Sequence, residues 1–150
     1  MLIRPISEID AAKIKELEAE LGLSAWSEQD YRLEAVRDDT LSFVAESGGV
    51  VVGFVISRFG FEAEILNIGI MPRNQKMGIG KALISKVIRE LSSRGAKRLT
   101  LEVRASNTAA KSFYSSLGFA VNGSRPNFYR NPTEGADLMF LEIEPHSRNG

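Results

Sequence analysis

The stretch QKMGIGKA occupies residues 75–82 and decides the fold, because it joins an apolar run at 65–71 to a long amphipathic segment. This position predicts a glycine-bearing loop between a strand and a helix. Main-chain N–H groups and the helix dipole at such a junction favour phosphate oxygens. Lys76 and Lys81 add positive charge, and no acidic residue occurs at 65–89. The stretch therefore predicts a loop that binds a pyrophosphate.

Two common glycine motifs do not fit these residues. The nucleoside-triphosphate loop GxxxxGK[ST] needs a hydroxyl after its lysine, but Ala82 follows Lys81. The dinucleotide fingerprint GxGxxG needs a third glycine where Leu83 stands. The stretch instead matches QxxGxG, which resembles the acyl-coenzyme A loop of the GNAT family of N-acetyltransferases. For the loop taken alone, a glycine-rich turn that only begins a helix remains the alternative.

Composition indicates one globular domain over residues 1–150. The chain has a mass of 16.5 kDa, is 43% hydrophobic and 25% charged, and contains no cysteine. Its first ten residues carry three charges, so they form neither a signal-peptide core nor a bilayer span, and we expect a cytoplasmic protein without membrane contact. His146 is the lone histidine and lies in the polar end at about 145–150, which we expect to be a flexible tail. We expect no metal site.

Charge is distributed unevenly although the formal net charge is zero. Residues 73–111 hold ten Lys or Arg against two acidic residues, whereas residues 1–46 hold five against eleven. This pattern fits an anionic ligand held by the middle segment and a cationic partner approached by the first segment. Two solvated surfaces of opposite sign are the alternative. A sequence pI of 6.6 without a basic, aromatic stripe argues against nucleic-acid binding.

Hydrophobic spacing and turn residues predict the order of elements. The expected helices begin at Ser7, Ser27, the glycine loop and Ser106 or Asn107, and end near Gly22, Val36, Gly95 and Gly118. The expected strands are 1–4, 41–45, 50–56, 64–71, 98–103, 119–121 and 138–143, with a long loop at 122–137. This order predicts an α/β fold whose sheet has mixed direction and helices on both faces.

Further motifs extend the resemblance along about residues 64–143. LEVRASNTAAKSFYSSLGF at 101–119 resembles the second half of the GNAT fold, and EILNIGIMP precedes it. The pattern is similar, more narrowly, to bacterial enzymes that acetylate the N-terminal alanine of a small-subunit ribosomal protein, which also carry a Trp-Ser pair like Trp26-Ser27. The resemblance implies a GNAT fold with a mixed, mostly antiparallel sheet flanked by helices on both faces. It also implies acetyl-CoA as co-substrate.

The resemblance implies a role for each residue of the site. Glu102 matches the general base, acting directly or through a water, and Tyr114 matches the general acid that serves the departing thiolate. Main-chain N–H groups at 67–71 are expected to stabilise the oxyanion. The implied coenzyme-binding residues are Ile68, Ile70, Met71, Gln75, Lys76, Met77, Gly78, Ile79, Gly80, Lys81, Asn107 and Tyr114. The implied substrate-binding residues are Trp26, Asn67 and Tyr129.

Simpler interpretations of these residues remain open. Glu102 can simply pair with Arg104 or with a lysine of a neighbouring strand, and Tyr114 can serve as core filler. Asn107 is also a plausible helix cap, which is compatible with a coenzyme contact. The role of Arg73 stays undecided between coenzyme contact and solvation of the loop.

The acceptor is the part of the function that the sequence defines least. The resemblance suggests a peptide or protein N-terminus between Trp26 and the segment at 128–129, with Glu34, Asp38 or Asp39 attracting a basic tail. Arg130 and Ala25 stand where the family pattern has proline, and both departures fall in this acceptor region. A small-molecule amine, a lysine side chain or a non-catalytic coenzyme-binding module are the alternatives. We expect a monomer or weak dimer.

Overall fold

The computed structural model describes residues 1–21, 26–129 and 132–144. They form a sheet of seven strands in the order β1-β2-β3-β4-β5-β7-β6, in which only β4 and β5 pair in parallel. The strands are β1 (Leu2–Pro5), β2 (Phe43–Ser47), β3 (Val50–Arg58), β4 (Glu62–Ile70), β5 (Arg98–Arg104), β6 (Ala120–Tyr129) and β7 (Glu134–Glu142). The helices are α1 (Ala11–Leu21), α2 (Glu28–Ala35), α3 (Ile79–Ser93) and α4 (Thr108–Ser116), with short 3₁₀ turns η1 (Glu8–Asp10) and η2 (Pro72–Asn74). The α/β fold with a mixed sheet is confirmed.

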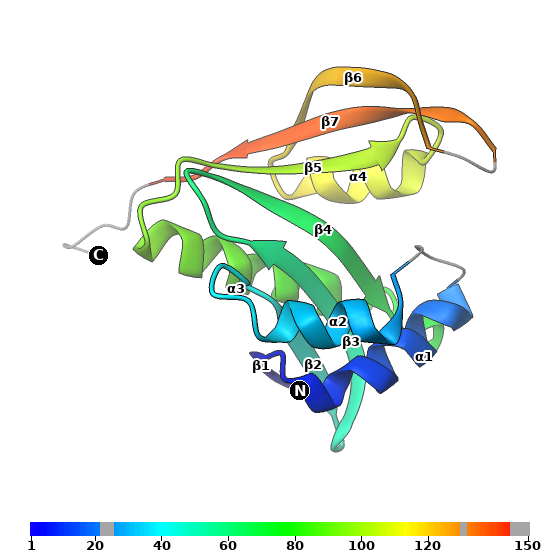
Figure 1. The fold of residues 1–150 in the computed structure, drawn as a ribbon. Coiled ribbons are helices and arrows are strands. Elements are labelled where there is room, and N and C mark those ends of the chain that lie inside the picture. Colours follow the sequence, from blue (N-terminus) through cyan, green and yellow to red (C-terminus); the bar gives the residue numbers. More distant parts are fainter. Residues whose placement is uncertain (22–25, 130–131, 145–150) are drawn as a thin grey trace.

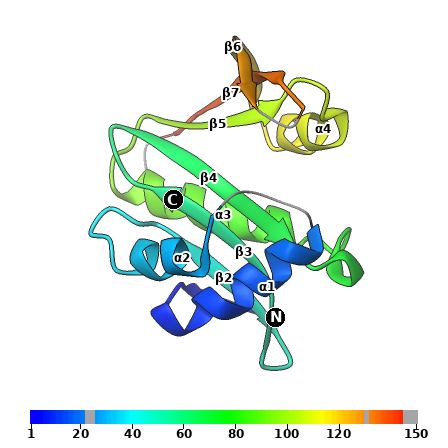
Figure 2. The same cartoon turned by 45° about the vertical axis from the view of Figure 1, so that its right-hand side comes forward.

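Helices cover both faces of the sheet, as expected. Figure 1 shows α1 and α2 on one side of β2, β3 and β4, and α3 on the other side. Turning the view, Figure 2 shows the same layers and places α4 beside the β5–β7 part of the sheet. None of the helices in the described ranges is long and apolar enough to cross a membrane.

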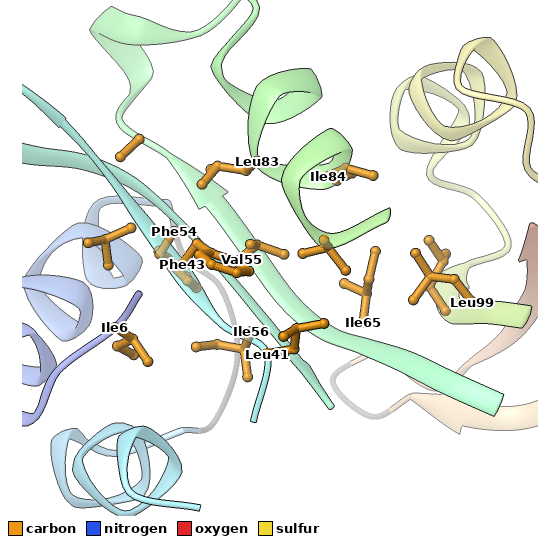
Figure 3. Packing of buried hydrophobic residues seen from close by; sticks show 14 of the residues in the cluster. Ile6, Leu41, Phe43, Phe54, Val55, Ile56, Ile65, Leu83, Ile84 and Leu99 are labelled. Atoms are coloured by element: carbon orange, nitrogen blue, oxygen red, sulfur yellow. The ribbon is translucent and has the colours of Figure 1, made fainter. Parts of the chain in front are cut away.

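The core lies between β3 and the two helical layers. Residues 51–57 of β3 are all buried, and such a strand reads as a continuous apolar run because both of its faces are covered. Phe54 contacts Tyr31 of α2 on one face. On the other face, Figure 3 shows Leu83 and Ile84 of α3 directed toward the sheet, where Val55 lies. Each fully buried Leu or Ile side chain contributes about 1.5–3 kcal/mol to folding.

Side-chain caps explain where two helices begin. Ser27 accepts a hydrogen bond from the N–H of Asp30 (3.0 Å), and the Asp30 carboxylate accepts one from the N–H of Ser27 (2.8 Å), which forms a capping box before α2. Asn107 accepts from the N–H of Ala110 (3.0 Å) and begins α4, so its expected capping role is confirmed. Ser7 precedes the turn η1, and α1 follows from Ala11. Gly22 lies outside the described residues.

The expected loop at 122–137 is wrong in its greater part. Residues 120–129 form β6 and residues 134–142 form β7, and the two strands pair antiparallel. β6 is an exposed edge strand with two register shifts, so it shows no alternation of apolar and polar residues. Pro126 is tolerated because an edge strand donates hydrogen bonds on one side only. Polar, bulged edge strands resemble loops in sequence.

β4 and β5 pair over one end only, and this opens the sheet. Their parallel register covers 62–64 of β4 and 98–100 of β5. Beyond this point the strands diverge, as Figure 1 shows, while β5 continues its pairing with β7 as far as Arg104. A register shift against β3 leaves Leu66 as the extra residue on β4, and bulges of this kind redirect a strand. The gap between the strands positions the candidate site.

Candidate active site

A cleft of about 440 Å³ lies where β4 and β5 separate. Six residues that the sequence singled out line it, contributed by β4, β5, β6, α4 and the cap of α4: Asn67, Ile68, Glu102, Asn107, Tyr114 and Tyr129. Ile65, Leu66, Leu101, Val103, Arg104 and Ala110 complete the lining. The cleft thus brings together side chains from segments that are far apart in the sequence.

Glu102 presents its carboxylate to the cleft from the middle of β5. Leu101 and Val103, on either side of it in sequence, are buried, so alternation along the strand turns Glu102 to the opposite face. Its side chain is 27% exposed, and Oε1 lies 3.4 Å from Nη1 of Arg125 on β6. The alternative pairing with Arg104 is not observed, since Arg104 contacts Glu134 (3.3 Å). The carboxylate is therefore accessible and close to one cation.

Tyr114 lies at the inner wall of the cleft on α4. The residue is 8% exposed, and its ring contacts Phe113 (5.3 Å) and Phe119 (5.6 Å between centroids). Its hydroxyl makes no hydrogen bond with any residue that the structure describes. Burial, with a smaller effect of Tyr129, raises the pKa of Tyr114 to about 12. The phenol therefore stays protonated at neutral pH and remains a donor.

Tyr129 reaches the cleft from the end of β6. Burial raises the pKa of its phenol, and the negative charge of Glu102 adds to this effect. The guanidinium of Arg104 lies over its ring at 4.4 Å, which fixes the ring plane. The preceding register shift includes Asn127 with φ of 57°, a conformation that asparagine tolerates better than most residues. The bulge thus directs an aromatic side chain toward Glu102.

The edge of β4 offers main-chain groups to the gap. The N–H of Met71 donates to the carbonyl of Val52 on β3 (2.8 Å), and N–H groups alternate between the two edges of a strand. The N–H groups of Ile70 and Ile68 therefore point away from β3, toward the opening. Two main-chain groups on this edge are already bound by side chains. The N–H of Ile68 donates to Oδ1 of Asn67 (3.0 Å), and the carbonyl of Ile70 accepts from Nε2 of Gln75 (3.1 Å).

The glycine loop follows directly and begins α3. Gly78 is the N-cap with φ of +83°, and an added Cβ there meets nothing within 4 Å. The first intrahelical bond runs from the N–H of Ala82 to the carbonyl of Gly78 (3.0 Å), which leaves the N–H groups at 79–81 without intrahelical acceptors. Lys76 adopts φ of 64° and is exposed. Open space, a helix N-terminus and lysines fit the pyrophosphate of a coenzyme.

Three residues of this region also serve packing, and one of them, Ile79, is 5% exposed and belongs to the core. Gly80 lies close to α4, because a Cβ there sits 3.2 Å from the ring of Phe113. Met71 is 3% exposed and belongs to the core, so its side chain does not face the loop surface. Gln75, Met77 and Lys81 are exposed around the cap of α3.

Trp26 does not line this cleft. Its ring packs on Tyr31 (5.0 Å between centroids) and borders a separate hollow beside α2. Glu34 borders that hollow too, but its carboxylate is buried and pairs with Arg58 (2.6 Å), so the expectation that it attracts a basic tail is wrong. Asp39 pairs with Arg37 (2.8 Å) and is exposed. The expected features at Ala25, Arg130 and His146 lie outside the described residues.

Sequence reasoning missed several charged groups near the cleft. Arg125 and Glu134 come from the segment expected to be a loop, and no periodicity marks them. Hydrogen bonds from Ser106 lower the pKa of the Glu134 carboxyl, which accepts from the N–H of Ser106 at 2.7 Å. A third charged group, Glu18, was also missed, and it lies fully buried in the interior rather than at the cleft. A signal existed for it, because Glu18 follows Ile14 by four residues and therefore shares the buried face of α1.

The arrangement suits acyl transfer chemically. A carboxylate accepts a proton, a protonated phenol donates one, and strand-edge N–H groups stabilise an oxyanion. Within the described part of the chain, no group of three or more His, Asp or Glu side chains has the geometry to hold a metal ion.

The comparisons with known proteins agree with this chemistry. Residues 11–119 match the sequence model of the acetyltransferase (GNAT) family. The [ribosomal protein bS18]-alanine N-acetyltransferase of Escherichia coli K12 is 39% identical over 123 residues, which cover 79% of this chain and 81% of that protein. The N-alpha-acetyltransferase RimI of Mycobacterium tuberculosis is 37% identical over 146 residues, covering 93% and 89% respectively.

A solved structure shows the same architecture. The crystal structure of the ribosomal-protein-S18-alanine N-acetyltransferase from Escherichia coli superposes with a TM-score of 0.88 at 33% identity, and covers 99% of this chain and 97% of that chain. The resemblance drawn from the sequence is thereby confirmed. The chain belongs to the acetyltransferase (GNAT) family and is an acetyl-coenzyme A-dependent N-acetyltransferase.

Proposed function

We propose that this enzyme acetylates the α-amino group of a protein N-terminus, and that its acceptor is a ribosomal protein that begins with alanine. One observation carries the proposal: Glu102, Tyr114 and the edge of β4 face a single cleft between diverging strands. The names of the Escherichia coli and Mycobacterium tuberculosis relatives, both N-terminal acetyltransferases, support the acceptor class. A ribosomal acceptor places the reaction in the cytoplasm, where we propose that a monomer or weak dimer acts.

Acetyl-CoA supplies the acetyl group as a thioester. Residues of the chain remove a proton from the acceptor, stabilise the oxyanion and donate a proton to the thiolate. Glu102 removes a proton from the acceptor ammonium, directly or through a water, so that the amine nitrogen can form the new C–N bond. Main-chain N–H groups at the edge of β4 stabilise the carbonyl oxygen as it gains negative charge. Tyr114 donates its phenolic proton toward the thiolate when the C–S bond breaks.

The proposed coenzyme contacts follow the course of β4 into α3. The carbonyl of Ile68 and the N–H of Ile70 face the gap rather than β3, and they are the edge groups available to the pantetheine arm, because the N–H of Ile68 already donates to Asn67 and the carbonyl of Ile70 accepts from Gln75. The loop from Gln75 to Lys81 surrounds the N-terminus of α3, which suits the pyrophosphate. Asn107 lines the cleft while it caps α4, so it can contact the arm through its remaining amide hydrogens.

The α-amino group is favoured over a lysine side chain by its acidity. A peptide α-amine titrates near ~8 and a lysine near ~10.4, a difference of about 2.4 units or ~3.3 kcal/mol for the base to supply. Glu102 is one partly exposed carboxylate beside a cation, Arg125. Such a base suits the easier deprotonation.

Mass spectrometry of an acetylated peptide tests the proposal. The substrate begins with alanine and contains two internal lysines, and its control is the same peptide with a blocked N-terminus. We expect one acetyl group on the N-terminal nitrogen, with release of one thiol per peptide, and no reaction of the control. Modification of the lysines with a free N-terminus would instead establish a side-chain acetyltransferase. Thiol release with polyamines but not with peptides would establish a small-molecule enzyme, and no release with any amine would leave only a coenzyme-binding module.

A further inference from the structure

A chain of hydrogen bonds leads from the cleft into the interior. The N–H of Ile68 donates to Oδ1 of Asn67 (3.0 Å), and Nδ2 of Asn67 donates to the hydroxyl of Tyr31 (2.7 Å). The Tyr31 hydroxyl in turn donates to Oε2 of Glu18. The chain joins β4, α2 and α1, and its members come from segments separated by 13 and 36 residues.

All donors in this chain point the same way, toward the carboxylate. Successive hydrogen bonds with one direction polarise each other and strengthen the whole. Glu18 is 0% exposed, and Nζ of Lys15 lies 3.4 Å from its Oε1. A carboxylate costs several kcal/mol to bury and is retained only where partners satisfy it. None of the steps proposed for the reaction uses Glu18 or Tyr31.

The outer end of the chain meets the cleft at the bulge of β4. Asn67 follows Leu66, the extra residue of that bulge, and both line the cleft together with Ile68. Asn67 binds the N–H of the residue after it, so its side chain fixes the orientation of the peptide unit that joins residues 67 and 68. The proposed reaction places the acetyl group against this edge of β4.

We propose that Glu18 and Tyr31 are positioning residues, which act through Asn67 to hold the Asn67–Ile68 peptide unit in the orientation that acetyl transfer requires. This proposal rests on the placement of the acetyl group beside the β4 edge given under the proposed function. Misplacement of reacting groups by about 1 Å costs up to 10²-fold in rate, so a chain remote from the chemistry can matter to turnover. A core network that only stabilises the fold is the alternative.

Tyr31→Phe tests the chain with little change in packing. The ring contacts with Trp26 (5.0 Å) and Phe54 (5.8 Å) remain possible, and only the hydroxyl shared by Asn67 and Glu18 is removed. We expect kcat for peptide acetylation to fall about 10-fold, while KM for acetyl-CoA changes less than about 2-fold. Ser57→Ala is the matched control, because it removes an equally buried hydroxyl that donates to the carbonyl of Leu41 and takes no part in the chain from Ile68 to Glu18.

The control separates stability from turnover. Both variants lose a buried hydrogen bond, so both should lower the melting temperature, but only Tyr31→Phe should lower kcat. A double-mutant cycle adds Asn67→Ala: if Tyr31 acts through Asn67, then Tyr31→Phe has no further effect on kcat in that background. Unchanged kcat in Tyr31→Phe, or additive effects in the cycle, would overturn the proposal.

Two further measurements keep the test decisive. Should Tyr31→Phe fail to fold, Glu18→Gln takes its place. This variant keeps a carbonyl acceptor for the Tyr31 hydroxyl but removes the charge at the end of the hydrogen-bonded chain, so we expect kcat to fall about 3-fold. An unchanged kcat would reject the positioning role of the chain. Wild type is assayed in parallel to test the proposed function, together with Glu102→Gln, which lacks the proposed base. If wild type acetylates no peptide N-terminus, the proposed function fails; if it does and Tyr31→Phe equals it, only the positioning role fails.

Discussion

We expect Tyr114→Phe to slow turnover about 100-fold while stability and coenzyme affinity stay nearly unchanged. The phenylalanine ring keeps the contacts with Phe113 and Phe119 at 5.3 and 5.6 Å. Because the Tyr114 hydroxyl binds no residue in the described part of the chain, its removal leaves no buried partner unsatisfied. The free energy of unfolding should therefore change by less than about 0.5 kcal/mol.

The expected loss of rate follows from the bond that the hydroxyl makes in the transition state. A hydrogen bond to a charged group contributes about 1.5–3 kcal/mol, which corresponds to a factor of roughly 10 to 160 in rate. Removal of a general acid typically costs about 10²–10⁴-fold. A loss near 100-fold satisfies both ranges.

The pKa of Tyr114 adds a test by pH. Burial raises this pKa to about 12, so the proton is present at every lower pH and is lost only as pH rises through that value. The wild-type kcat should then show no alkaline decline from this group up to about pH 10, the ordinary value for tyrosine. A decline near that value which disappears in Tyr114→Phe would contradict the burial of the Tyr114 hydroxyl in the wall of the cleft.

A thiol-release assay measures kcat, calorimetry measures coenzyme affinity, and thermal unfolding measures stability. Tyr129→Phe is the matched control, since Tyr129 lines the same cleft but is proposed to contact the acceptor. For this control we expect a raised KM for the peptide and a kcat reduced by less than about 10-fold. The reasoning is refuted if both variants turn over equally fast, or if Tyr114→Phe unfolds several degrees earlier than wild type.

Three further predictions concern the base, the loop and the fold. Glu102→Gln should lower kcat most at low pH, and in a pH–rate profile kcat should recover above about pH 8, because the α-amine then loses its proton unaided. A loss of kcat that is the same at every pH would exclude the role of Glu102 as base. Gly78→Val should abolish acetyl-CoA binding in calorimetry, whereas Gly95→Val, which imposes the same strain at φ of +78° in open space, should not. For Asp10, burial opposes ionisation, but the hydrogen bonds from Arg4 and Ser7 and the positive charge of Arg4 together outweigh it and lower the pKa of the carboxyl. Its stabilisation is present above about pH 4 and is lost as pH falls through the folded pKa. Asp10→Asn should therefore cost about 1.5–3 kcal/mol in urea unfolding near neutral pH and progressively less as pH falls below about 4. A cost that stays constant over this acidic range would refute the pairing.

Local patterns predicted the elements around the glycine loop well. Ile84, Val87, Ile88 and Leu91 recur at helical spacing, which predicts a helix there; the structure buries three of them on the inner face of α3 and leaves Ile88 half-buried. The alternation of Leu99, Leu101 and Val103 in the sequence predicts that Glu102 turns away from the apolar face of its strand, as the structure shows, and Asn107 caps α4 as expected. These features depend on residues within about two helical turns of each other, so a single stretch of sequence contains the whole signal.

Features that depend on distant strands were not predictable in this way. The β6–β7 hairpin was missed because β6 is polar and bulged and has no alternation of apolar and polar residues. Its strand conformation depends on hydrogen bonds to β7 rather than on its own residue pattern. Arg125 and Glu102 are brought to within 3.4 Å by the strand order β5-β7-β6, in which Arg125 on β6 reaches across β7 to Glu102 on β5. Glu34 was interpreted as a surface acid, but the position of Arg58 on β3 makes it half of a buried ion pair.

The sequence by itself determined the family, the glycine loop before α3 and the residue types available for acetyl transfer, because motif and periodicity are properties of neighbouring residues. Only the tertiary structure decided that β4 and β5 separate after three paired residues, which creates the cleft, and that Glu18, Tyr31 and Asn67 join in one hydrogen-bonded chain. The physical reason is that strand pairing and buried polar contacts are chosen by packing over the whole core. Segments that lie 36 residues apart meet only once the chain has folded.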